Sequence, residues 1–409
     1  MNKRIIRRIL PKWIITLLKR GRLYLYKKRN GLKLINTPYH VSEIGEKGTD
    51  TFFGYYDISP FNDKNEILYL EVPRGGQCAK VILNDISGSN KKVITTTNAF
   101  NTQQGSRLRW YPGSNDIVIF NDYINGKYVS RKVNVRTQEQ ELIPYPLYDI
   151  SPDGKYAITL NFERLGVLRP GYGYTNKPYV PEDDLSNESI SLVDMSTYNI
   201  SPIITYKEIA KVMGENDGDY DLNYINHLSF SPNGEKFLFF WLKNEKNWAK
   251  ASMLQYNFDS KDIIILENEL RVSHYTWINN NVIMCTAISG SSINDMECRY
   301  YLYEAGKERR VVGQNDLLRD GHPTLFKDTI FLTDTYPDIY SYQLLFLYDK
   351  EKGVKHKLVY SYSVPVKNEV FRTDMHPRFN VDKSIICYDA NVKGERRLYL
   401  LKDWKYAIN

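Results

Sequence analysis

Four of the six histidines in this chain stand at matching positions of a repeated pattern. They are His227, His274, His322 and His376, whereas His40 and His356 lie outside the pattern. Neutral imidazole is the commonest side-chain ligand of transition metals, and histidine is also the usual acid or base near neutral pH. The repeated placement therefore predicts a functional cluster, although a recurrent histidine could instead hydrogen-bond an adjacent loop.

The repeated pattern consists of a short strand, a turn such as Ser-Pro, and a strongly apolar strand. Its seven copies begin at Tyr55, Arg107, Leu147, His227, His274, His322 and His376. The second and fourth positions of each copy are apolar or aromatic almost throughout, while the first and third are mostly polar or ionisable. A period of two indicates a strand with one packed face and one face that is not packed.

The spacing of the copies indicates the architecture. Successive copies begin 40 to 54 residues apart, apart from a gap of 80 between the third and fourth. This matches a four-stranded propeller blade, whereas one open sheet of about 28 strands would far exceed normal sheet sizes. We predict an all-β fold, a seven-bladed β-propeller over residues 36–409 with an insertion around 165–188, preceded by a basic helical segment over residues 1–35.

In such a propeller the polar face of each inner strand lines a central channel. Besides the four histidines, this face would carry Tyr55, Asp57, Arg107, Arg109, Asp149 and Arg378. Arg372 and Asp374 precede His376 at two-residue steps and would extend the same face. Guanidinium groups bind carboxylates as paired donors, and an imidazole can remove a proton, so the wall suits an acidic saccharide. Asp57 and Asp149 would serve equally well as caps of the adjacent turns.

Charge is concentrated at the amino terminus. Residues 1–33 contain twelve Lys or Arg and no acid; since the whole chain carries +7, the remainder carries −5. A mildly acidic body argues against nucleic-acid binding. The apolar stretch Trp13–Leu18 is too short for a signal peptide or a spanning helix. We expect a helix on an anionic membrane surface, with a solvated tail, a helix packed on the body, or polyanion binding as alternatives.

Other features narrow the class of protein. The four cysteines form no CxxC pair and no disulfide framework, which favours a reducing, cytoplasmic location, peripheral on the inner membrane face if residues 1–33 bind lipid. The common phosphate-loop, dinucleotide, zinc-protease, serine-hydrolase and calcium motifs are absent from the sequence. The strand–helix alternation of a doubly wound glycosyltransferase is also missing.

Three segments carry a resemblance to a known family. Asp320-Gly321-His322-Pro323, Thr333–Asp338 and Asp374–Phe379 resemble oligogalacturonate-lyase-like seven-bladed propellers, within the wider TolB/WD40-like group. The resemblance implies a manganese-type ion held by His274, His322 and His376. It also implies His227, with Arg107 or Arg109, as the base or carboxylate-binding group. Where that family has a second histidine two residues after the first, this chain has Thr324 and Arg378.

These observations leave three functional hypotheses. The first is a lyase-like protein that binds or processes an acidic oligo- or polysaccharide, with substrate contacts from Tyr55, Asp57, Asp149, Arg372, Asp374 and Arg378. The second is a membrane-associated glycosyl-transfer or assembly protein of capsule or lipopolysaccharide biosynthesis. The third is a non-catalytic propeller scaffold that binds other proteins.

Overall fold

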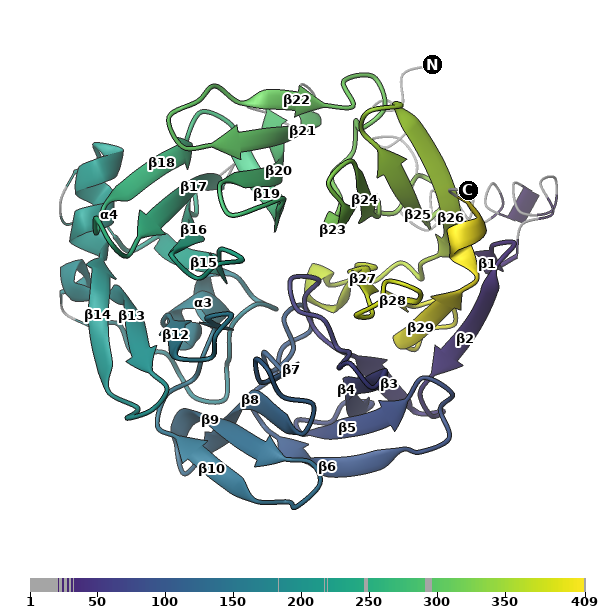
Figure 1. The fold of residues 1–409 in the computed structure, drawn as a ribbon, viewed down its shortest axis with the longest axis horizontal. Helices are drawn as coiled ribbons and strands as arrows, with labels where there is room; N and C mark the ends of the chain where they lie inside the picture. The colour runs from purple at the N-terminus through teal and green to yellow at the C-terminus, as the bar shows by residue number, and fades with distance from the viewer. Residues whose placement is uncertain are drawn as a thin grey trace.

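The predicted seven-bladed propeller is confirmed by the computed structural model of the protein. The structure describes residues 21, 24, 25, 28, 31, 33–182, 184–216, 218, 220–245, 249–290 and 296–407. Seven antiparallel sheets are arranged around a common axis (Figure 1). Most of residues 1–33, and with them the expected membrane-surface helix, lie outside the described residues. No helix among the described residues has the length and apolar character needed to cross a bilayer.

The blades follow one another along the chain, and blades 1 to 5 have their strands in sequence order from the inside outward. Blade 1 contains β3 (Thr49–Phe52), β4 (Glu66–Pro73), β5 (Ala79–Asp85) and β6 (Lys92–Thr97). Blade 2 contains β7 (Arg109–Trp110), β8 (Ile117–Ile124), β9 (Lys127–Asn134) and β10 (Gln140–Ile143). Blade 3 contains β11 (Asp149–Ile150), β12 (Tyr156–Thr159), β13 (Ser189–Asp194) and β14 (Ile200–Thr205). Blade 4 contains β15 (Asn223–Phe230), β16 (Lys236–Lys243), β17 (Lys250–Asn257) and β18 (Ile263–Glu267).

The last three blades complete the ring with help from the amino-terminal strands. Blade 5 contains β19 (Arg271–Trp277), β20 (Val282–Ser289), β21 (Glu297–Glu304) and β22 (Arg310–Val312). Blade 6 contains β23 (Thr324–Lys327), β24 (Ile330–Thr333), β25 (Tyr342–Asp349) and β26 (Val354–Tyr362), with β1 (Ile35–Asn36) as a fifth strand. Blade 7 contains β27 (Arg378–Phe379), β28 (Ile386–Ala390), β29 (Arg397–Lys402) and, outermost, β2 (His40–Ile44). Because β2 pairs with β29 in register from His40↔Lys402 to Ile44↔Leu398, hydrogen bonds join the two ends of the chain.

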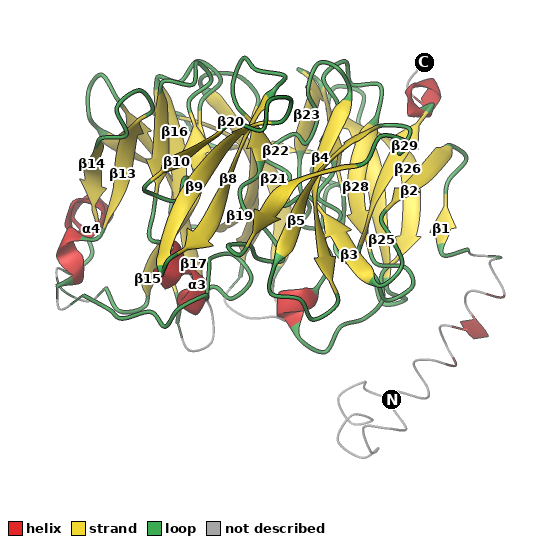
Figure 2. Cartoon of the chain, turned by 90° about the horizontal axis from the view of Figure 1, so that it is seen from below, coloured by secondary structure: helices red, strands yellow, loops and turns green. Residues whose placement is uncertain are grey.

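Few helices interrupt this pattern. From residue 33 onward, among the described residues, they are α3 (Phe162–Leu168), α4 (Tyr206–Met213) and the single turns η1 (Leu185–Asn187), η2 (Glu369–Phe371) and η3 (Trp404–Ala407). α3 and η1 lie in the long connection between β12 and β13 of blade 3. Figure 2 shows α3 and α4 at one end of the propeller, opposite the end at which the carboxyl terminus lies.

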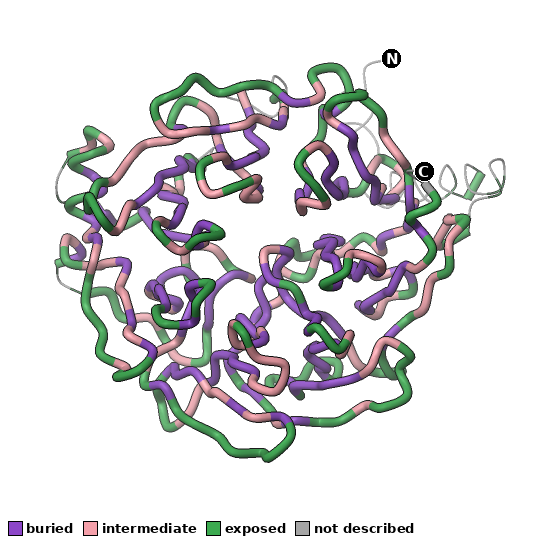
Figure 3. Tube along the Cα trace, viewed as in Figure 1, coloured by how far each residue is buried: buried purple, intermediate pink, exposed green. Residues whose placement is uncertain are grey.

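The core lies between neighbouring sheets. One buried cluster joins residues of blades 1, 2 and 7, including Leu68, Val118 and Leu400. Figure 3 shows the buried stretches following the inner strands, while the outer connections are exposed. This arrangement follows from the sequence alternation, because the apolar positions of each inner strand pack against the next blade.

The first copy of the repeat differs from its prediction. Tyr55–Pro60 is not a strand; β3 ends at Phe52, and the following segment crosses the channel. Gly54 permits this path, since its φ is +148° and an added Cβ would lie 2.8 Å from the carbonyl oxygen of Gln104. The Tyr56 hydroxyl donates to the carbonyl of Tyr275 and accepts from its N–H, both at 2.7 Å. Blade 1 is thus tied across the channel to blade 5.

Candidate functional site

Four imidazoles surround the Tyr55 ring at the centre of the propeller. The ring centroid of Tyr55 lies 4.8 Å from that of His376, 5.1 Å from His227, 6.1 Å from His322 and 6.4 Å from His274. His322 is also 4.0 Å from His274 and 4.5 Å from His376, between ring centroids. All four histidines are buried, as is Tyr55, whose hydroxyl has no hydrogen-bond partner among the described residues. The histidines of blades 4 to 7 therefore meet in one place.

Three of the rings are oriented through their Nδ1 atoms. His322 Nδ1 lies 2.8 Å from Asp334 Oδ1, and His274 Nδ1 lies 2.9 Å from Asp320 Oδ1. His376 Nδ1 lies 3.1 Å from the carbonyl oxygen of Gly54. Because carboxylate and carbonyl oxygens only accept, each Nδ1 carries a proton. Burial lowers the pKa of His274 and of His376, so their Nε2 atoms keep a lone pair near pH 7, whereas for His322 the Asp334 carboxylate outweighs burial and raises the pKa. This is the arrangement found around metal-binding histidines, where the outer partner fixes the tautomer.

The backbone that presents these side chains is unusual. His227 and His376 have positive φ angles of 58° and 43°, and so does Arg107 at the equivalent place in blade 2, at 54°. The pairing of β15 with β16 shifts register between Asn226 and Ser229, which is a bulge around His227. Non-glycine residues in this conformation cost free energy and tend to occur at functional sites.

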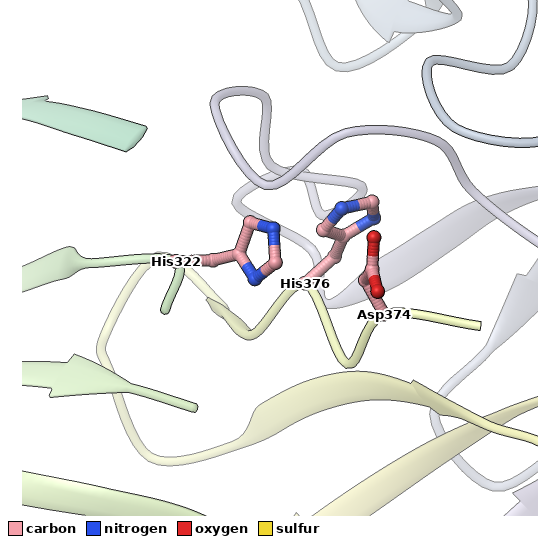
Figure 4. Close-up of side chains that lie close together, drawn as sticks. All are labelled: His322, Asp374 and His376. Atoms are coloured by element: carbon pink, nitrogen blue, oxygen red, sulfur yellow. The ribbon is translucent and has the colours of Figure 1, made fainter. Parts of the chain in front are cut away.

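Two histidines and one carboxylate form a group suited to a divalent ion (Figure 4). Nitrogen or oxygen atoms of His322, His376 and Asp374 all lie within 4.8 Å of one another, and the Asp374 side chain is buried. The Nε2 atoms of both histidines are buried without a hydrogen-bond partner among the described residues. Such atoms are costly unless a ligand satisfies them, and mixed imidazole–carboxylate sets bind ions of the manganese and zinc type. The residues therefore fit a divalent metal.

This metal-suited group differs from the one implied by the resemblance. Asp374, expected to contact substrate, replaces His274, whose ring lies next to His322 but outside the group. His274 instead forms a dyad with Asp320, which also accepts hydrogen bonds from Ser273 and Thr286 at 2.6 Å each. Burial lowers the pKa of the His274 imidazole, so the ring is neutral near pH 7 and can accept a proton at Nε2.

In His227 the other ring nitrogen, Nε2, has the protein partner. Its Nε2 lies 3.3 Å from the side-chain amide nitrogen of Asn226. The Asn226 oxygen already accepts from Tyr148 and Gln104, so the amide N–H faces the imidazole. The ring proton then sits on Nδ1, which has no partner among the described residues. His227 is thereby equipped to donate a hydrogen bond to a ligand, which suits the carboxylate-binding role expected for it rather than the alternative role of base.

Acid should destabilise the protein through His227. Burial, and then the neighbouring His274 and Arg107, hold the pKa of His227 well below its ordinary value of 6.5. The unfolded chain therefore takes up a proton below pH 6.5 that the folded chain does not, and stability falls as the pH falls. When the pH is lowered from 7.5 to 5.5, this group should reduce the free energy of unfolding by about 1.4 kcal/mol.

Urea unfolding of His227→Gln at both pH values, in chelator, measures this contribution. The variant should lose about 1.4 kcal/mol less than the wild type over this range. His40→Gln is the matched control, since His40 is exposed on β2 and should change nothing. Identical pH dependence in wild type and His227→Gln would show that His227 titrates normally in the folded protein.

Arginine side chains lie near the histidines. Of Arg169, Arg271 and Arg372, only Arg372 was predicted from the sequence. Arg372 donates to Asp374 at 2.9 Å and to the Tyr172 hydroxyl at 3.1 Å. The Arg169 guanidinium lies 5.1 Å from the centroid of the Tyr172 ring. Burial and the nearby Arg169 lower the pKa of Arg271, which begins β19. Arg169 and Tyr172 come from the long connection of blade 3, whose irregular sequence carries no periodic signal that would place them here.

The other arginines expected in the channel are paired within the protein. Arg107 forms a buried bidentate pair with Asp57, at 2.9 and 3.3 Å, and its Nε donates to the carbonyl of Tyr148. Arg378 donates to the backbone carbonyls of Gly54 and Tyr55 and supports the crossing segment. These two side chains position the site rather than face a ligand.

Arg109 and Asp149 lie apart from the histidines. They form an ion pair that lines a separate cavity of about 380 Å³, together with Tyr56 and Tyr275. None of the four histidines is among the described residues that line this cavity. The expected single His/Arg funnel is therefore divided, with the imidazoles in one region and the Arg109–Asp149 pair in another.

The fold is shared with known enzymes. A solved structure described as oligogalacturonate lyase in complex with manganese superimposes with a TM-score of 0.66, at 14% identity, over 90% of this chain and 94% of its own. Oligogalacturonate lyase from Vibrio parahaemolyticus gives a TM-score of 0.62, at 11% identity, over 90% and 97%. TolB from Acinetobacter baumannii is more distant, with a TM-score of 0.41 at 11% identity over 83% and 67%. No protein-family model and no curated protein matches the sequence. The expected resemblance to oligogalacturonate-lyase-like propellers is therefore confirmed for the fold.

Proposed function

We propose that this protein is a metal-dependent, lyase-like enzyme acting on an acidic saccharide. The observation that carries the proposal is the convergence of two buried Nε2 atoms, of His322 and His376, with the Asp374 carboxylate; neither Nε2 atom has a hydrogen-bond partner among the described residues. Cationic Arg372 lies beside them. The proposal also draws support from the shared fold of two oligogalacturonate lyases, one of them described in complex with manganese.

Each residue of the site has a separate role in the proposed elimination. A divalent ion held by His322, His376 and Asp374 would supply Lewis-acid stabilisation of negative charge on a uronate. Arg372 and Arg169 bind the substrate carboxylate, which makes the hydrogen on the adjacent carbon acidic. His274, oriented by Asp320, removes that proton, and the electron pair forms a carbon–carbon double bond while the glycosidic C–O bond breaks. The leaving oxygen takes a proton from water and His274 returns its proton to water, so that atoms and charge balance, while neutral His227 donates a hydrogen bond to the substrate from Nδ1.

The test is the appearance of unsaturated product from uronate oligosaccharides, followed by ultraviolet absorbance. We expect product with added Mn²⁺ and its loss in chelator. His274→Ala should lower the rate by about 10²–10⁴-fold while Mn²⁺ still binds, because a general base is removed and the metal group is kept. His40→Ala is the control. No product from any uronate glycan, with Mn²⁺ bound, would refute the lyase proposal.

A second candidate is a glycosyl-transfer or assembly role on acidic saccharides at a membrane. It is favoured by residues 1–33, whose twelve cations and lack of acids suit an anionic lipid surface, where we would then place the protein. The assay above separates the two candidates, because transfer yields a longer or relinked saccharide without a double bond.

A further inference from the structure

An apolar groove lies directly beside the histidine cluster. Its volume is about 450 Å³, and its apolar lining comes from Ile288, Met296, Cys298, Leu318, Pro337 and Ile339. Ile339, Leu318 and Met296 are exposed to 74%, 49% and 38%. Large apolar side chains gathered at this exposure around one concavity indicate a site that is covered by a ligand.

The groove and the histidine cluster have two residues in common. Asp320 and Tyr336 line the groove. Asp320 holds His274 Nδ1 at 2.9 Å, and the Tyr336 ring centroid lies 6.2 Å from that of His274 and 5.9 Å from that of His322. The groove and the histidine cluster are therefore adjacent, with Asp320 and Tyr336 between them.

Three charged residues, Arg319, Asp320 and Asp338, line the groove together with its apolar side chains. Asp320 accepts four hydrogen bonds, from Ser273, His274, Thr286 and Gly321. Asp338 accepts from Tyr360 at 2.6 Å and from two backbone N–H groups. Both carboxylates are thus engaged by the protein, while the exposed Arg319 lines the groove and Arg372 lies by the cluster. The site therefore has cationic Arg372 at the histidine cluster and exposed apolar side chains in the adjoining groove.

We propose that the substrate is an amphiphilic glycoside, with its acidic sugar among the histidines and an apolar aglycone in this groove. The inference rests on the proposed function for the position of the sugar. The groove accounts for apolar exposure that an unsubstituted uronate oligosaccharide would leave uncovered. A lipid-carried saccharide is the substrate class that has both parts.

Calorimetric binding of three ligands, below their micelle concentrations and with Mn²⁺ present, tests the inference. The ligands are octyl glucuronide, methyl glucuronide and octyl glucoside. Octyl glucuronide should bind at least tenfold more tightly than methyl glucuronide, because each methylene buried in the groove favours binding. Ile339→Asp and Leu318→Asp should each remove most of this advantage and leave methyl glucuronide unaffected. Val381→Asp is the matched control, as Val381 is a 54% exposed apolar residue that does not line the groove.

The outcomes separate the inference from the proposed function. Equal affinity for octyl and methyl glucuronide would overturn the amphiphile, while binding of the methyl compound would still support an acidic-sugar site. Equal affinity for octyl glucuronide and octyl glucoside would refute the acidic-sugar site and leave an apolar-binding groove. A loss in Val381→Asp as large as in Ile339→Asp would show non-specific partition of the alkyl chain and also overturn the inference.

Discussion

Replacing His322 with alanine should lower the affinity of the protein for Mn²⁺ by at least about 100-fold, because losing a ligand costs more than the 10–100-fold seen for outer partners. His322 is the ring most firmly fixed, since Asp334 accepts both its backbone N–H and its Nδ1–H. Removing the imidazole takes away one of the three metal-suited groups, while Asp334 keeps the backbone N–H groups of residue 322 and of Met375. Isothermal titration of the apo protein with Mn²⁺ measures the effect.

Two companion variants make this result specific. Asp334→Asn keeps the ligand but weakens its orientation, and should cost about 10–100-fold in affinity. His40→Ala removes an exposed imidazole from β2 and should titrate as the wild type does. If a folded His322→Ala protein bound Mn²⁺ with wild-type affinity, the ion would not be held by this group.

Replacing Arg107 with methionine should lower the free energy of unfolding by about 3–5 kcal/mol. Arg107 and Asp57 have side-chain exposures of only 2% and 7%, and their pair joins blade 2 to the segment that crosses the channel. Methionine fills much of the same volume but leaves the Asp57 carboxylate buried without its cation. Urea denaturation at neutral pH measures the loss.

Two control variants show whether the loss of stability comes from breaking a buried ion pair or from removing any positive charge. Lys64→Met breaks an exposed pair with Asp116, with exposures of 53% and 43%, and should cost less than about 1 kcal/mol. Adding Asp57→Asn to Arg107→Met should restore part of the stability, because the uncompensated charge is removed. A cost for Arg107→Met no larger than that of Lys64→Met would return Arg107 to the set of candidate ligand-binding residues.

The propeller could be predicted because its signal is local and repeated. Each inner strand alternates polar and apolar residues, so seven weak patterns reinforce one another and also place the histidines of blades 4 to 7 in one register. No such repeated pattern indicates that the segment containing Tyr55 and Tyr56 crosses the channel. It depends on Gly54 and on a hydrogen bond to Tyr275, 219 residues away in the sequence.

Which residues form the site was harder to predict, because alternation along one strand does not determine where each side chain points or which other blade it contacts. Register places a residue on a face but does not fix its direction, and His376 has a positive φ that an ideal strand lacks. Asp374 could thus be assigned to the channel but not to the metal-suited group. The pairing of Arg107 with Asp57 and the approach of Arg169 depend on contacts between blades, which alternation within one strand does not encode.

The central claim is that His322, His376 and Asp374 jointly hold a divalent ion, and anomalous diffraction from crystals grown with Mn²⁺ tests it most directly. We expect one strong anomalous peak bounded by the Nε2 atoms of both histidines and a carboxylate oxygen of Asp374. A map with Mn²⁺ bound only elsewhere, or with no peak at saturating Mn²⁺, would contradict it.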